Sequence, residues 1–193
     1  NGRRRQRQMC IRDRYNVSQS QTGRYNGMKM LFALVMVFSF ITSFLLANSL
    51  ELGSPAPRLK VLTDEGITLD LGEALSTGTT LVFFYPKAMT PGCVKQACSL
   101  RDDWDELQAR DVKIFGVSKD TVKTQAQFRD KYTLPFTLLA DTDRKIADAF
   151  SKPMIRQAYL FKDGILVWRD LMAATSKQAT DVLAALDELG PNS

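Results

Sequence analysis

The stretch "TTLVFFYPKAMTPGC" (residues 79–93) joins a continuous apolar run to a turn-forming segment and a cysteine. The run before Pro86 is rich in β-branched and aromatic residues, a composition typical of a strand that is buried on both faces. Thr90 is a residue type that caps helices, and Pro91 is tolerated at the first helical position. The stretch therefore predicts a central strand, a short loop and a helix that starts just before Cys93.

Outward from this stretch, strand-like and helix-like segments alternate. Residues 58–71 and 156–170 each predict a β-hairpin, the second with its turn at Asp163-Gly164. Further strands are expected within 111–120 and 134–141, and further helices within 121–132, 143–150 and 176–189. The helix after Thr90 has one apolar stripe at spacings of four and three: Cys93, Ala97, Leu100, Trp104 and Leu107. This order indicates an α/β domain with a mixed central sheet, helices on both faces and an N-terminal hairpin.

The first 49 residues differ in composition from the rest. Residues 1–27 contain seven arginines and one aspartate, so we interpret them as a non-native or disordered leader and assign no role to Cys10. Residues 28–49 have the pattern of a secretory signal peptide that is cleaved after Ser49. The alternative is an uncleaved membrane anchor, although the apolar run of 16 residues is short of the roughly 20 that span a bilayer. We therefore predict an exported, periplasmic or cell-envelope protein.

The basic character of the chain belongs to this leader. The whole chain has a net charge of +5, but residues 1–29 hold eight of the 26 basic residues and one of the 21 acidic ones. The remainder has 18 basic and 20 acidic residues, a net charge of −2. A mildly acidic domain lacks the basic footprint that nucleic acid requires, so no nucleic-acid partner is expected. Residues 50–193 are long enough for one domain with its own core.

The chain contains no histidine, and this absence excludes several mechanisms. Cys-His proteases, Ser-His-Asp hydrolases and histidine-ligated zinc sites cannot be built without it. Cys93 and Cys98 are too few for a structural zinc site or an iron–sulfur cluster, so neither a metal nor a cofactor is expected. What remains is thiolate chemistry on an electrophile such as a peroxide or a disulfide.

The spacing of Cys93 and Cys98 limits how they can react with each other. Residues five apart on a regular helix have Cα atoms roughly 8.6 Å apart, whereas a disulfide needs about 4.4–6.8 Å. The two thiols can therefore pair only if the helix unwinds. The start of a helix stabilises an anion by at most about 2 kcal/mol, which is not enough to make the thiolate the dominant form of a cysteine. A cation and a hydroxyl donor such as Thr90 are therefore expected beside Cys93. The alternative for either cysteine is a small buried hydrophobic residue.

The segment "FYPKAMTPGCVKQACSLRDDWDEL" (residues 84–107) resembles the active-site segment of the peroxiredoxins of the AhpC/TSA superfamily. It is most similar to the subfamily called PrxQ or bacterioferritin comigratory protein. Pro86, Thr90 and Cys93 stand at the fixed positions of the family motif Pro-x-x-x-Thr-x-x-Cys. The resemblance implies a thioredoxin-like fold and a thiol peroxidase that reduces hydrogen peroxide and organic hydroperoxides. The family is mostly cytosolic or plastid, so the export pattern departs from it.

The resemblance also implies a role for each site residue. Cys93 would be the peroxidatic nucleophile, and Cys98 the resolving cysteine that condenses with its sulfenic acid. Thr90 would hydrogen-bond the sulfur and the peroxide, Pro86 would shield the pocket from water, and Arg156 would supply the positive charge. A thioredoxin-like or other dithiol protein would be the reductant. An intrahelical disulfide needs no second subunit, so a monomer is expected.

Two other functions stay open at this point. The first is an exported thiol–disulfide oxidoreductase of thioredoxin-like fold, although such enzymes place their cysteines as C-x-x-C and this chain has C-x-x-x-x-C. The second is a non-catalytic, redox-sensing or chaperone-like module. Consumption of peroxide by the purified domain separates the peroxidase from both alternatives.

Overall fold

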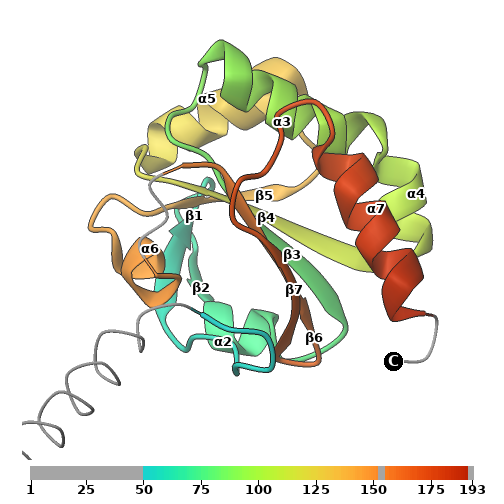
Figure 1. Cartoon of the computed structure of the whole chain (residues 1–193). Coiled ribbons are helices and arrows are strands. Elements are labelled where there is room, and N and C mark those ends of the chain that lie inside the picture. The colour runs from blue at the N-terminus through green and yellow to red at the C-terminus, as the bar shows by residue number, and fades with distance from the viewer. Residues whose placement is uncertain (1–49, 152–154, 191–193) are drawn as a thin grey trace, which may run out of the picture. The chain divides into compact units, whose positions relative to one another are not determined.

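The computed structural model describes residues 50–151 and 155–190. Its centre is a seven-stranded mixed sheet with the order β2-β1-β5-β4-β3-β6-β7 (Figure 1). The strands are β1 (Lys60–Thr63), β2 (Thr68–Asp70), β3 (Thr79–Phe84), β4 (Val112–Ser118), β5 (Thr137–Ala140), β6 (Gln157–Lys162) and β7 (Ile165–Asp170). The mixed sheet predicted from the alternating pattern is confirmed.

The central strand β3 pairs in parallel with β4 and antiparallel with β6. Its side chains alternate between two cores: Leu81 and Phe83 belong to one, and Val82 and Phe84 belong to the other. All four side chains are at most 5% exposed. Apolar residues stand at successive positions because both faces of this strand are covered.

Helices cover both faces of the sheet, as predicted (Figure 1). One face packs against α3 (Pro91–Asp102), α4 (Trp104–Ala109), α5 (Val122–Tyr132) and α7 (Gln178–Leu189). The other face packs against α2 (Leu71–Ala74) and α6 (Lys145–Ala149). The single turn of α2 was not expected from the sequence pattern. It is stabilised by Asp70, whose Oδ1 accepts a hydrogen bond from Glu73 N at 3.1 Å.

Antiparallel pairs lie at both edges of the sheet. β1 pairs with β2, with Lys60 opposite Asp70, and also with β5. At the other edge β6 and β7 are joined through Asp163 and Gly164, which have φ angles of 47° and 81°. Positive φ at both central residues is the requirement of a type I′ hairpin turn, and a glycine at the second position meets it without strain.

Helix α3 starts where the sequence predicts. Thr90 is the N-cap residue with extended backbone, and Pro91 is the first helical residue. The helix does not run through to Leu107, because the backbone leaves the helical conformation at Asp103 (φ −101°, ψ 21°). The apolar stripe is therefore divided between α3 and α4, and Trp104 begins the second helix.

The predictions for residues 1–27 and 28–49 lie outside the described residues. Within the described ranges, no helix combines the length and the apolar character that crossing a membrane requires. The division of the chain into a leader, a signal segment and a domain from residue 50 stays a prediction.

Gly116 on β4 provides a test of the packing between the central strands. A Cβ atom there would lie 2.6 Å from Leu138 Cδ2 and 2.8 Å from Phe83 Cζ. We expect Gly116→Ala to lower the free energy of unfolding by about 1–3 kcal/mol, because overpacking forces these buried side chains out of their positions. Urea unfolding followed by circular dichroism measures the change. The control is Gln127→Ala at an exposed position of α5, for which a change within about 0.5 kcal/mol is expected; equal stability of the two variants would contradict the packing.

Candidate active site

The site lies where β3 passes into α3, at the carboxyl end of the central strand. Cys93 is the third residue of α3 and its side chain is fully buried. The first backbone N–H groups of a helix have no hydrogen-bond partner within the helix. In α3 the first residue, Pro91, has no N–H, so the first such groups are those of Gly92 and Cys93. A negative charge on the Cys93 sulfur is therefore favoured at this end of the helix.

Arg156 supplies the positive charge. Its Nη2 donates a hydrogen bond to Cys93 Sγ at 3.6 Å. Arg156 precedes β6, and β6 pairs with β3 so that Gln157 lies opposite Phe84, the last residue of β3. The sheet thus brings together two residues that are 63 positions apart in the sequence. Arg156 is thus in contact with the Cys93 sulfur, and its catalytic role stays a prediction.

Gly92 makes this approach possible. A Cβ atom at position 92 would lie 2.4 Å from Arg156 Nη2 and 3.2 Å from Arg156 Cζ. Only a residue without a side chain leaves the guanidinium room to reach the sulfur over the first turn of α3. The sequence prediction missed this role, although the glycine directly before Cys93 was a signal that could have indicated it.

Thr90 is close in sequence but does not donate to the sulfur in this conformation. Its Oγ1 donates to Lys87 O at 2.9 Å, and its side chain makes no hydrogen bond that caps α3. A hydroxyl has a single hydrogen. Thr90 must therefore give up its hydrogen bond to Lys87 O before it can donate to Cys93 or to a bound peroxide.

A polar network holds the loop that carries Pro86 and Thr90. Asp120 Oδ2 accepts from Ala88 N at 2.7 Å and from Ser118 Oγ at 2.7 Å. Gln125 Nε2 donates to the same Ser118 Oγ at 3.0 Å. Ser118 is the last residue of β4, Gln125 lies on α5, and Asp120 lies in the loop between them. The active-site loop is therefore held by the strand that pairs in parallel with β3 and by the loop and helix that follow that strand. Asp120, Ser118 and Gln125 were not predicted as site residues from the sequence.

Tyr85 connects the end of β3 to this network. Its hydroxyl donates to Gln125 Oε1. Burial raises the pKa of Tyr85 well above its ordinary value. The hydroxyl therefore stays protonated and can donate the hydrogen bond to Gln125. In the same loop Met89 adopts a φ of 62°, a left-handed conformation that is uncommon for a residue with a side chain. Such strain is kept only where the surrounding contacts fix the backbone.

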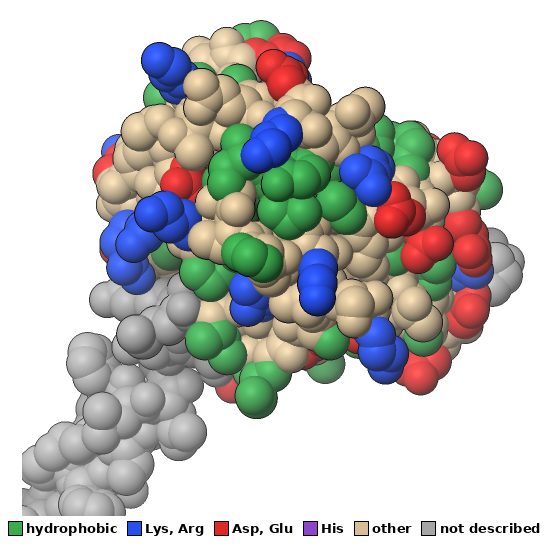
Figure 2. All heavy atoms as spheres, turned by 90° about the horizontal axis from the view of Figure 1, so that it is seen from above, with side chains coloured by type: hydrophobic (Ala, Val, Ile, Leu, Met, Phe, Trp, Pro, Cys, Tyr) green, Lys and Arg blue, Asp and Glu red, His purple; other side chains and the backbone are tan. Residues whose placement is uncertain are grey.

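Pro86 lies at the surface. It lines a cavity of about 170 Å³ together with Phe84, Arg144 and Ile155, and Cys93 is not among the residues around it. Figure 2 looks down on the helices at the top of Figure 1 and shows hydrophobic side chains gathered at the surface, with lysine and arginine side chains around them. Shielding of the Cys93 sulfur from water by Pro86 stays a prediction.

Cys98 occupies the same helix and is half-buried. Burial raises the pKa of its thiol, and the nearby Arg101 opposes this shift. Cys93 and Cys98 are both free thiols. Since α3 is helical from Pro91 to Asp102, their Cα atoms are roughly 8.6 Å apart on a regular helix, beyond disulfide reach.

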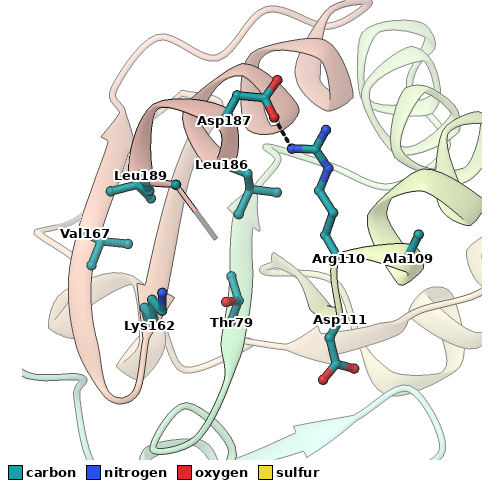
Figure 3. Close-up of a pocket in the computed structure, with 10 residues that line it drawn as sticks. Thr79, Ala109, Arg110, Asp111, Lys162, Val167, Leu186, Asp187 and Leu189 are labelled. Carbon is teal, nitrogen blue, oxygen red and sulfur yellow. Dashed lines mark hydrogen bonds and ion pairs between the residues drawn. The ribbon is translucent and has the colours of Figure 1, made fainter. Parts of the chain in front are cut away.

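A larger cavity, of about 550 Å³, has neither Cys93 nor Arg156 among the residues that line it, most of which are labelled in Figure 3. It includes Thr79, the first residue of β3, whereas Cys93 follows the other end of that strand. Arg110 on its wall forms an ion pair with Asp187, and Leu186 and Leu189 make its apolar side. The cavity is therefore at the opposite end of the sheet from the reactive thiol and takes no part in the chemistry at Cys93.

Comparison with known proteins agrees with this geometry. Residues 52–169 match the family described as AhpC/TSA. This chain belongs to the AhpC/TSA family. It is 44% identical over 102 residues to a putative peroxiredoxin bcp of Coxiella burnetii, an alignment that covers 53% of this chain and 67% of the relative. It is 41% identical over 103 residues to peroxiredoxin Bcp of Escherichia coli K12, covering 53% and 65%.

Solved structures of the same family share the fold. A mutant of Xanthomonas campestris peroxiredoxin Q is 28% identical with a TM-score of 0.63, covering 68% of this chain and 92% of that one. BcpB from Mycobacterium tuberculosis is 28% identical with a TM-score of 0.66, covering 72% and 98%. The predicted thioredoxin-like peroxiredoxin fold and the predicted resemblance to the PrxQ and Bcp subfamily are confirmed.

The prediction of an exported, periplasmic or cell-envelope protein is wrong. The similarity places the chain with the Bcp and PrxQ peroxiredoxins, and none of the relatives given above is named as an exported protein. The prediction rested on an apolar run of 16 residues behind one lysine. Such a run is longer than a signal-peptide core of about 7–15 residues and shorter than a membrane span, so its length does not identify a signal peptide. The cleavage predicted near Ser49 lies outside the described residues.

The contact between Arg156 and Cys93 can be tested through Gly92. We expect Gly92→Ala to displace the guanidinium and to slow alkylation of Cys93 by iodoacetamide at pH 7 about tenfold, since an unpaired thiol is less often a thiolate. Peptide-resolved mass spectrometry separates Cys93 from Cys10 and Cys98. In the Arg156→Met background the glycine substitution should have no further effect. A tenfold loss in both backgrounds would show that Gly92 acts independently of Arg156.

The raised pKa of Cys98 predicts how its reactivity depends on pH. In the Cys93→Ser variant, alkylation of Cys98 should keep accelerating above pH 9, because burial disfavours the thiolate in the folded protein. In urea the same thiol should titrate near the ordinary value of about 8.5. Rates measured from pH 7 to 11 give both curves. Coincidence of the folded and unfolded curves would contradict the burial of this thiol.

Proposed function

We propose that this protein is a thiol peroxidase that reduces hydrogen peroxide and organic hydroperoxides, with Cys93 as the nucleophile. The observation that carries the proposal is the buried Cys93 sulfur at the start of α3, with Arg156 Nη2 at 3.6 Å, in a chain of the AhpC/TSA family. The alignments cover about two thirds of the curated relatives' length, and the names of those relatives as peroxiredoxins support the same activity.

In the first step the Cys93 thiolate attacks one oxygen of the peroxide. The O–O bond breaks, an S–O bond forms, and the other oxygen leaves as an alkoxide or hydroxide that takes up a proton. The sulfur is oxidised by two electrons to a sulfenic acid, and the peroxide is reduced to an alcohol or water. This step uses no metal, cofactor or histidine base, and the described residues beside the Cys93 sulfur supply the cation Arg156.

Arg156 and the start of α3 act together in this step. Arg156 is permanently charged and has several donors, so one N–H can stay on the sulfur while another meets the oxygen that becomes negative. The N–H groups of Gly92 and Cys93 stabilise negative charge from the other side. Thr90 completes the set after its hydroxyl leaves Lys87 O and turns toward the peroxide. Pro86 shields the Cys93 sulfur from water, as predicted from the resemblance.

Cys98 resolves the sulfenic acid. Its thiol attacks the Cys93 sulfur, the S–O bond breaks, and a disulfide and one water molecule form. Because both residues lie on one helical segment, α3 must unwind between them before the sulfurs can meet. A thioredoxin-like or other dithiol protein then supplies two electrons and returns both cysteines to thiols. A monomer is sufficient for this cycle.

The two alternatives have less support. A thiol–disulfide oxidoreductase places its pair as C-x-x-C, whereas here four residues separate Cys93 from Cys98. A non-catalytic module gives no reason for a cation to lie against a buried thiol, with a glycine at the position where a side chain would displace it. The family match favours the peroxidase over both.

Two substitutions test the cycle. Cys93→Ser should abolish peroxide consumption with a dithiol reductant, because the nucleophile is gone. Cys98→Ser should consume about one equivalent of peroxide and leave a sulfenic acid at Cys93, detected by dimedone labelling and peptide mass spectrometry. In the unsubstituted chain, peroxide should lower the mass by two hydrogens as the disulfide forms.

Cys10→Ser is the matched control and should behave as the unsubstituted chain does. Full peroxide turnover by Cys93→Ser would refute the assignment of the nucleophile. Normal cycling of Cys98→Ser with the same dithiol would refute an intramolecular resolving role, while leaving Cys93 as the nucleophile.

A further inference from the structure

Two buried glutamines connect the helix that carries both cysteines to the last helix of the chain. Gln96 lies between Cys93 and Cys98 on α3, and Gln178 is the first residue of α7. Both side chains are fully buried. Gln96 Nε2 donates to Gln178 Oε1 at 2.9 Å and lies 3.4 Å from Phe84 O at the end of β3. Since Phe84 O can only accept, this contact fixes the orientation of the Gln96 amide.

The hydrogen bonding of this pair is incomplete. Gln96 Oε1 and Gln178 Nε2 have no hydrogen-bond partner among the described residues. Burying a polar atom without a hydrogen-bond partner costs free energy, and this cost cancels part of the stability that the neighbouring hydrogen bonds contribute. The pair therefore specifies where α3 docks on α7 while adding little net stability to the docked state.

The remaining contacts divide α3 into two parts. Ser99 Oγ accepts from Ala179 N at 3.2 Å, so α3 also supplies a partner to an N–H at the start of α7. Beyond the cysteines, Arg101 Nη1 donates to Tyr132 O at the end of α5 at 2.8 Å. The hydrogen bonds from α3 to the start of α7 thus come from Gln96 and Ser99, and the hydrogen bond to α5 comes from Arg101, beyond both cysteines.

We propose that the buried Gln96–Gln178 pair is a latch that sets how readily α3 unwinds to bring Cys93 and Cys98 together. The inference rests on the proposed function, because it concerns the step between the sulfenic acid and the disulfide. When α3 unwinds, Gln96 leaves its buried position and its hydrogen bonds to Gln178 and Phe84 break. The two glutamines are positioning residues: they touch neither the peroxide nor the reacting sulfur atoms.

The incomplete bonding predicts opposite effects for single and double substitutions. Gln178→Leu removes one partner and leaves the Gln96 amide still less satisfied, which destabilises the docked helix. Condensation of the sulfenic acid with Cys98 should then be about fivefold faster. Gln96→Leu combined with Gln178→Leu removes every unpaired amide atom and keeps an apolar contact, which stabilises the docked helix. Condensation should then be about fivefold slower.

The experiment measures the two steps separately on the full chain. After one equivalent of hydrogen peroxide, samples quenched with acid and analysed by mass spectrometry give the rate of disulfide formation. The same substitutions in the Cys98→Ser background give the rate of sulfenic acid formation with dimedone, which should change less than twofold. Hydrogen exchange of the α3 amides in the reduced protein should follow the condensation rates, faster in the single variant and slower in the double.

Controls keep the test decisive. Gln127→Leu makes the same change at an exposed position of α5 and should alter neither rate. Gln178→Asn, which is one methylene too short for the 2.9 Å bond, replaces Gln178→Leu if that variant does not fold. Unchanged condensation, or a change of the same sign in the single and double variants, would overturn the latch. If peroxide forms no disulfide between Cys93 and Cys98 in the unsubstituted chain, the proposed resolving step itself is wrong.

Discussion

The contact between the Arg156 guanidinium and the buried Cys93 sulfur is the interaction on which the site depends. A buried thiol can hold a negative charge only if the surrounding groups replace the water that it has lost. Here they are a permanent cation at 3.6 Å and the free N–H groups at the start of α3. Gly92 gives the cation room to approach, and the pairing of β6 with β3 brings it to this end of the sheet.

The central strand β3 explains why these groups meet. Because both of its faces are buried, it lies in the interior of the sheet, and its ladders to β4 and β6 set its register. The loop after it is then tied to the next parallel strand through Asp120 and Ser118, and this fixes the start of α3. The reactive thiol is thus positioned by the sheet, although it is carried by a helix.

Helix α3 has to satisfy two opposed requirements. It is intact where the Cys93 sulfur lies beside Arg156, and in the proposed cycle it opens for that sulfur to reach Cys98. An interface made only of well-packed apolar side chains would favour the first at the expense of the second. The Gln96–Gln178 pair, buried but only partly bonded, lies where a compromise between the two states can be set.

The sequence by itself determined the buried strand, the start of α3 and the helices on both faces, because these follow from local patterns. It also supplied Cys93 as the candidate nucleophile, through a fixed motif. The resemblance to the peroxiredoxins also pointed to Arg156. The sequence prediction failed on the localisation, which was inferred from one apolar run, and on the length of α3, where a periodic stripe concealed the break at Asp103. The roles of Gly92, Asp120, Gln96 and Gln178 were decided only by the tertiary structure. Each of them acts on a group brought close by sheet pairing or helix packing, and no local pattern encodes that proximity.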